Sequence, residues 1–233
     1  MTDLPALIRE ALAAAGDPTK AEPMRAYMKS SLPLRGVQAS PLKALLRPLL
    51  ADHPLPDRLS WEAAVLDLWD EAAFREERYA AEALAGHHHY RAHQDFETLS
   101  LYEHMIVTGA WWDHVDNIAA HRVGPILLAD PETVGVRLLE WARSDDLWLR
   151  RTAIIAQLGA RTETDADLLA EAIRSNLEGS RFGSEFFIRK AIGWALRQHA
   201  KTDPEWVVRF VNTHDASLSG LSRREALKHL QSL

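Results

Sequence analysis

A charged residue recurs in helical segments of this 233-residue chain at intervals of 34 to 39 residues. The period is first visible at two helix start signals, Asp130-Pro131-Glu132 and Asp203-Pro204-Glu205, which lie 73 residues apart. In each signal the aspartate can cap free backbone N–H groups, the proline fits the first turn and the glutamate complements the helix dipole. Each aspartate is followed 21 residues later by the second arginine of a pair. The chain therefore repeats a unit larger than one helix.

The repeated position is occupied in turn by Arg78, Asp116, Arg151, Lys190 and Arg224. Apolar residues recur at three- and four-residue spacing in the surrounding segments, and no stretch alternates convincingly as a strand would. Helix pairs that repeat at roughly 35–45 residues are typical of HEAT-like solenoids. The sequence therefore predicts an all-α, HEAT-like helical repeat solenoid, an α-α superhelix with a concave groove, as a single domain over residues 1–233.

The composition and charge of the chain exclude several classes of protein. The chain has no cysteine and a formal charge of −6, which excludes disulfides, cysteine-ligated metals and thiol nucleophiles. The N-terminus lacks a signal-peptide pattern and no apolar run is long enough to span a membrane, so we expect a cytoplasmic protein. The charge is uneven, because residues 181–233 carry nine Lys and Arg against five Asp and Glu. This C-terminal excess of cations indicates a locally positive surface on an acidic body.

Equivalent positions of stacked repeats fall in a row along the inner helices. Cations at most positions of this row predict a track for phosphates, to which the neighbouring Arg150 and Arg189 are added. The alternative is that these are ordinary solvated helix charges. Lys190 could also form a Schiff base with an opened sugar, although a phosphate contact is the better interpretation. Asp116 is the one carboxylate in the row and needs a different explanation.

Two tryptophans lie beside the row. Trp112 precedes Asp116 by four residues and Trp194 follows Lys190 by four, so each indole shares a helix face with a charged residue. Aromatic faces beside a carboxylate could hold a sugar or a base. The carboxylate itself is an electrostatic match for the oxocarbenium-like sugar formed when a glycosidic bond breaks. The departing base would need no protonation if it were already cationic, as a purine alkylated on a ring nitrogen is.

Other aromatic and histidine clusters receive structural interpretations. The tryptophans at apolar helical positions are assigned to the core: Trp61, Trp69, Trp141 and Trp206. Trp111 and Trp148 stay unassigned. The run His87-His88-His89, with His93, looks like a metal cluster. Three adjacent histidines in a turn rarely converge on one ion, however. We therefore expect no metal site and no cofactor.

Three segments closely resemble motifs of the AlkD-like DNA alkylation repair enzymes: Trp111–Asp116, Leu147–Arg151 and Phe186–Trp194. Tyr27-Met28-Lys29 and the segment from Arg197 to Lys201 are similar too, and the resemblance runs from about residue 20 to the end. It implies a HEAT-like solenoid that acts as a monofunctional glycosylase. Such an enzyme excises positively charged alkylpurines, among them 3-methyladenine and 7-methylguanine, from double-stranded DNA.

The same resemblance assigns roles to individual residues. It implies that Asp116 is the catalytic carboxylate, that Trp112 and Trp194 flank it, that Arg151 is its basic partner and that Tyr27 contacts DNA. Relatives that lack the aspartate are not glycosylases, and this sequence keeps it. We expect a monomer that binds alkylated duplex DNA. The alternative is a non-catalytic HEAT-repeat module that binds a DNA structure or a protein, and whether the target base is flipped stays open.

Overall fold

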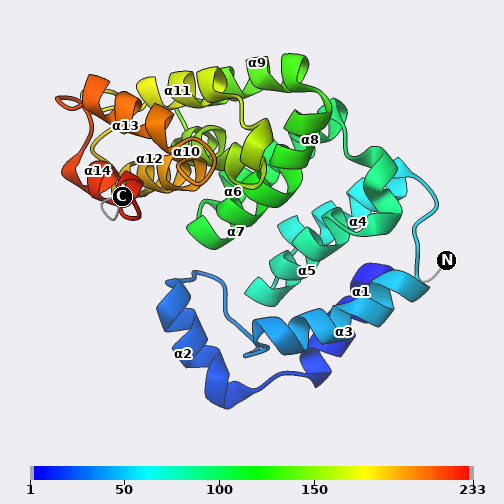
Figure 1. Cartoon of the computed structure of the whole chain (residues 1–233). Helices are drawn as coiled ribbons and strands as arrows, with labels where there is room; N and C mark the ends of the chain where they lie inside the picture. Colours follow the sequence, from blue (N-terminus) through cyan, green and yellow to red (C-terminus); the bar gives the residue numbers. More distant parts are fainter. Residues whose placement is uncertain (1–2, 231–233) are drawn as a thin grey trace. The chain divides into compact units, whose positions relative to one another are not determined.

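The structure, a computed structural model, describes residues 3–230 (Figure 1). Within that range all regular structure is helical, as the sequence predicts. Shorter turns are η1 (His88–His93), η2 (Phe96–Thr98), η4 (Ala156–Gly159) and η5 (Arg161–Glu163), and a π-helical turn, η3 (Ala119–Val123), connects α7 to α8. The α-helices are α1 (Leu4–Ala14), α2 (Pro18–Met28), α3 (Ala39–Asp52), α4 (Arg58–Asp70), α5 (Arg75–Ala85), α6 (Leu99–Gly109), α7 (Trp112–Ile118), α8 (Gly124–Ala129), α9 (Pro131–Trp141), α10 (Leu147–Ile155), α11 (Ala166–Arg174), α12 (Phe186–His199), α13 (Pro204–Thr213) and α14 (Gly220–Ala226).

Both helix start signals read from the sequence are confirmed. Asp130 precedes α9 and its side chain accepts the Thr133 N–H at 3.2 Å. Asp203 precedes α13 and accepts the Trp206 N–H at 2.8 Å. Each cap satisfies a donor that the first helical turn leaves free, a contribution of about 1 kcal/mol.

The chain folds into two compact units, one ending at His93 and the other beginning at Gln94. The single domain over residues 1–233 stays a prediction. Among the described residues, no helix has both the length and the apolar character needed to cross a membrane.

In the first unit, α4 and α5 pack together and α1 and α3 pack against α5. Trp61 and Trp69 of α4 are completely buried, which confirms their assignment to the core. The buried carboxylate of Glu76 accepts backbone N–H groups of the segment that precedes α3, including those of Gly36 and Val37 at 2.9 and 3.1 Å. This carboxylate thereby holds the connection between α2 and α3 in place.

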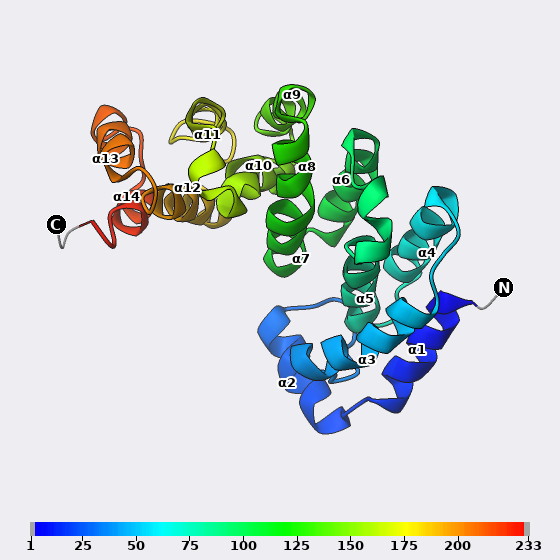
Figure 2. The ribbon, with the colours of Figure 1, turned by 45° about the vertical axis from the view of Figure 1, so that its right-hand side comes forward.

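The second unit contains two layers of helices. Helices α10, α12 and α14 pack in sequence, and α7 packs against α10. Helices α9, α11 and α13 form the other layer, drawn above the first in Figure 2. The charged residues of the row are the fifth residues of α7, α10, α12 and α14: Asp116, Arg151, Lys190 and Arg224. The period in the sequence is therefore the period at which inner helices stack.

Gly193 of α12 allows α14 to approach closely. A Cβ at this position would lie 2.6 Å from the Cβ of Glu225 and 3.1 Å from the carbonyl oxygen of Ser222. We predict that Gly193→Ala lowers the free energy of unfolding by about 1–3 kcal/mol, because the added methyl overpacks this contact. Urea unfolding of both proteins measures the change.

Gly135→Ala in α9 is the matched control for that variant. A Cβ at Gly135 would meet only Leu168, at an ordinary 3.9 Å, and alanine is favoured over glycine in a helix by about 0.5–1 kcal/mol. This control should be as stable as the wild type or more stable. A Gly193→Ala protein that unfolds at the wild-type urea concentration would contradict the close approach of α12 and α14.

Candidate functional site

Asp116 of α7 and Arg151 of α10 form an ion pair in the second unit. Arg151 Nε donates to Oδ1 of the carboxylate and Nη2 donates to Oδ2, both at 2.7 Å. A third donor, Nη1, bonds the carbonyl oxygen of Phe187 at 2.5 Å. This bidentate geometry fixes the plane of the carboxylate. The Arg151 side chain is 5% exposed and that of Asp116 16% exposed, so the carboxylate keeps one accessible edge while the arginine is enclosed.

Burial raises the pKa of the Asp116 carboxyl above the ordinary value for aspartate. The hydrogen bonds and charge of Arg151 act in the opposite direction, and the nearby charge of Asp113 adds to the rise. Water has been removed from most of the carboxylate, and a single guanidinium compensates its charge. A positive group that reaches its accessible edge would therefore be attracted more strongly than by an aspartate in bulk water.

An open hollow of about 350 Å³ borders this edge of Asp116. Its volume lies in the range of small-ligand sites. Trp194 of α12, half-buried against the core of this unit, lines the same hollow. The other lining residues come from α7, η3, η4 and α12: Asn117, Ala120, His121, Leu158, Gly159 and Gln198. The structure thus brings together the carboxylate and one of the two indoles that the sequence singled out.

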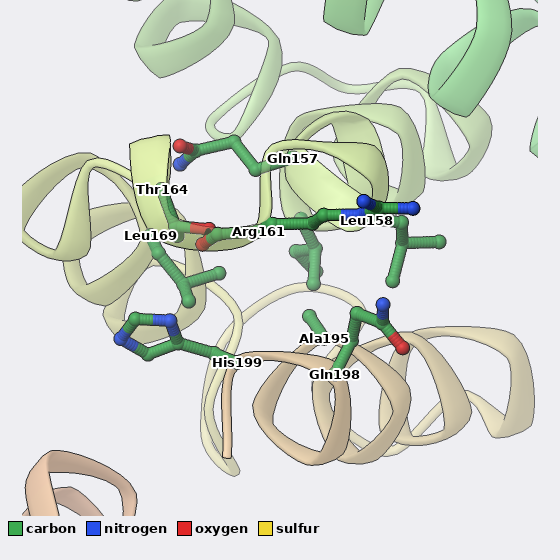
Figure 3. Close-up of a pocket in the computed structure, with 9 residues that line it drawn as sticks. Gln157, Leu158, Arg161, Thr164, Leu169, Ala195, Gln198 and His199 are labelled. Carbon is green, nitrogen blue, oxygen red and sulfur yellow. Dashed lines mark hydrogen bonds between the residues drawn. The ribbon is translucent and has the colours of Figure 1, made fainter. Parts of the chain in front are cut away.

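A smaller cavity of about 10 Å³ shares Leu158 and Gln198 with the hollow (Figure 3). His199 lines it, its Nε2 has no hydrogen-bond partner, and burial lowers the pKa of this imidazole. The space is about that of one water molecule. It is too small for a nucleobase or a sugar and is not part of the candidate site.

The two indoles left unassigned by the sequence pack against Phe187 of α12, which is next to the ion pair. Trp111 lies 5.6 Å from the ring of Phe187, and Trp148 lies 4.9 Å from the same ring. The carbonyl oxygen of Phe187 is the one that Arg151 bonds. Trp112, which begins α7, is exposed and does not line the hollow. Trp111 and Trp148 therefore hold the partner of Arg151, while Trp112 offers a free aromatic face.

Glu225 of α14 is the partner of the predicted DNA contact Lys190, and the sequence reasoning did not single it out. Lys190 Nζ donates to its Oε1 at 3.1 Å, and Arg197 pairs with its other oxygen. The hydrogen bond from Lys190 is the main cause that lowers the pKa of Glu225. Glu225 lies 35 residues after Lys190, the same interval that separates Asp116 from Arg151. That repeated interval was the signal that could have found it.

Comparison with known proteins agrees with the motifs. The profile of the family described as DNA alkylation repair enzyme matches residues 8–230. The chain belongs to the DNA alkylation repair enzyme family. A solved structure, a predicted DNA alkylation repair enzyme from Enterococcus faecalis, is 31% identical with a TM-score of 0.80, covering 94% of this chain and 98% of that one. The comparison with curated proteins found no match. The resemblance inferred from the sequence and the all-helical fold are confirmed.

In this member of the DNA alkylation repair enzyme family, the Arg150 side chain forms hydrogen bonds inside the protein. Its side chain is buried and donates to the carbonyl oxygens of Arg143, Ser144 and Ser175 and to the side chain of Asn176. Neighbouring residues of a helix point in different directions, and Arg150 points into the protein whereas Arg151 reaches Asp116. The sequence prediction that Arg150 contacts DNA is therefore not part of the function proposed below.

The other predicted DNA contacts of this family member lie in both units. In the second unit Arg224 is exposed and Arg189 is half-buried. In the first unit Tyr27 is exposed on α2, and Arg78 of α5 donates to the carbonyl oxygen of Trp69 and lies over its ring. Nothing in their placement assigns a ligand, so their contact with DNA stays a prediction.

The histidine turn of the first unit brings three imidazole rings close together. One ring nitrogen from each of His87, His88 and His89 lies within 4.8 Å of those of the other two. Burial is the main cause that lowers the pKa of His87, and its two neighbours add to the effect. The three imidazoles therefore lie close together, and the sequence expectation that they do not share one ion stays a prediction.

Proposed function

We propose that this member of the DNA alkylation repair enzyme family is a glycosylase that hydrolyses the N-glycosidic bond of cationic alkylated purines in double-stranded DNA, with 3-methyladenine and 7-methylguanine as substrates. One observation carries the proposal. The Asp116 carboxylate, fixed by two hydrogen bonds from Arg151, presents its accessible edge at a hollow that Trp194 also lines.

The reaction suits a single carboxylate. As the bond between the sugar C1′ and the purine nitrogen breaks, its electron pair leaves with the base and positive charge develops on the sugar. A cationic alkylpurine departs as a neutral molecule, so it needs no proton from an acid. Asp116 then stabilises the sugar cation and takes the proton of the water that attacks C1′; the products are an abasic site and a proton that Asp116 releases to solvent.

The remaining residues position the DNA. Trp194 contacts the sugar or base of the damaged nucleotide, and the exposed indole of Trp112 contacts the adjoining backbone. Lys190, whose side chain is 39% exposed although paired with Glu225, presents a charged ammonium suited to a phosphate. We propose a phosphate contact and not a Schiff base for Lys190, because it bonds Glu225 and does not line the hollow beside Asp116. Arg189, Arg224, Arg78 and Tyr27 complete the proposed contacts.

Release of free base from methylated duplex DNA tests the proposal. We predict that the purified protein releases 3-methyladenine and 7-methylguanine, measured by chromatography of the soluble bases, and leaves abasic sites in the duplex. Hypoxanthine in the same duplex is the matched control: the proposed mechanism includes no proton transfer to the departing base, which a neutral purine needs, so hypoxanthine should not be released. A protein that binds methylated duplex without releasing base would instead support the non-catalytic binding module.

A further inference from the structure

The histidine turn lies at the end of α5, outside the proposed reaction. The rings of His87, His88 and His89 are mutual neighbours, with centroid distances of 4.2, 4.5 and 4.4 Å. His88 and His89 are exposed and His87 is half-buried. The Nδ1 atom of His87 is buried without a hydrogen-bond partner. A buried nitrogen without a partner is costly and calls for an explanation.

The backbone that carries these rings is held on both sides. The N–H of His87 bonds the carbonyl oxygen of Leu84 at 3.1 Å, and the N–H of Tyr90 bonds that of His87 at 3.0 Å. Tyr90 is buried, stacks on Trp61 at 5.6 Å and accepts the Leu55 N–H at its hydroxyl oxygen at 2.9 Å. The three imidazoles therefore project from a fixed turn, so little further conformational entropy is lost when they converge.

Three converging imidazoles match the ligand requirements of a zinc ion. Zinc takes His nitrogens at about 2.0–2.1 Å in tetrahedral geometry, which places the nitrogens roughly 3.3 Å apart. The present nitrogens, within 4.8 Å of one another, reach that spacing if the exposed rings of His88 and His89 rotate. Imidazole ligands suit zinc better than magnesium or calcium, which prefer oxygen.

We propose that His87, His88 and His89 bind one zinc ion whose fourth position is left to water. The ion would connect the end of α5 to η1 and stabilise the first unit, because only the folded turn brings the three ligands together. This site is structural and takes no part in the proposed base excision. It also revises the expectation that the chain holds no metal.

Isothermal titration of the full-length, chelator-treated protein with zinc chloride tests the proposal. We expect one ion per chain and a rise in the unfolding temperature when zinc is present. His88→Gln and His89→Gln should each weaken binding by at least ~10-fold, the smallest effect typical even of residues that only support metal ligands. The triple variant His87→Gln/His88→Gln/His89→Gln should not bind. Since His88 and His89 are exposed, their replacement leaves the fold intact, which circular dichroism checks.

His104→Gln is the matched control, because this exposed histidine lies on α6 of the second unit and outside the cluster. It should bind zinc as the wild type does. Tetrahedral coordination can be read independently from the visible absorption of a cobalt(II) complex, which the triple variant should lack. Absence of zinc binding by the wild type, or equal binding by the wild type and the triple variant, overturns the proposal.

Discussion

Asp116→Asn should reduce excision of 3-methyladenine by at least ~10²–10³-fold, the usual loss when a group that stabilises transition-state charge is removed. The amide has nearly the same shape as the carboxylate, and its oxygen can still accept a hydrogen bond from Arg151. It cannot, however, offset the positive charge of the sugar. DNA binding should persist or strengthen, since a negative charge is removed near the phosphates. Single-turnover excision and fluorescence anisotropy at a fixed salt concentration measure the two effects separately.

Asp113→Asn is the matched control for that variant. Asp113 lies on the same helix, and its charge reaches Asp116, but it does not line the hollow. Its replacement removes the same charge from α7, so we expect excision within a few-fold of the wild type. Equal losses in the two variants would mean that the general negative charge of α7 matters. Wild-type excision by Asp116→Asn would remove Asp116 from the reaction.

The arrangement of the inner helices could be predicted because the period places related residues at the same turn of successive helices. Asp116 and Arg151 are 35 residues apart and meet in an ion pair. Spacing does not fix the direction of a side chain to within one residue, however. The row therefore predicted Arg224 beside Lys190, whereas Glu225 is its partner. A shift of one residue around a helix decides which side chain faces the neighbour.

Long-range packing explains the features that the sequence did not predict. Arg150 and Arg151 are equivalent by composition, but only the structure shows that the first bonds the segments around Ser144 and Ser175. The convergence of the three histidines depends on Tyr90, which fixes the turn by contacts with Leu55 and Trp61. Contacts of this kind join residues distant in the chain, and no local spacing encodes them.

Arg151→Gln should have the largest effect on stability. It leaves the largely buried Asp116 without its guanidinium, and removal of one partner of a buried pair typically lowers the free energy of unfolding by about 3–5 kcal/mol. Asp116→Asn/Arg151→Gln should recover much of that loss, since neither charge then remains buried. Urea unfolding of the four proteins forms a double-mutant cycle that isolates the coupling between the two side chains. Additive effects would contradict the bidentate pair.

The same variant should change the pH dependence of excision. Arg151 is the group that lowers the pKa of Asp116 against the rise caused by burial, so its loss must raise that pKa further. Because the reaction requires the ionised carboxylate, excision falls as the pH falls through this pKa, and in Arg151→Gln that fall should begin at a higher pH than in the wild type.

Stability changes in the opposite sense. A folded state whose aspartate has a raised pKa binds the proton more tightly than the unfolded chain, so the stability deficit of the variant should shrink as the pH is lowered from neutral. Excision rates and free energies of unfolding measured over the same pH range therefore test one carboxylate in two ways. If the acid side of the pH–rate profile of Arg151→Gln were the same as that of the wild type, Asp116 would not be the group that must be ionised.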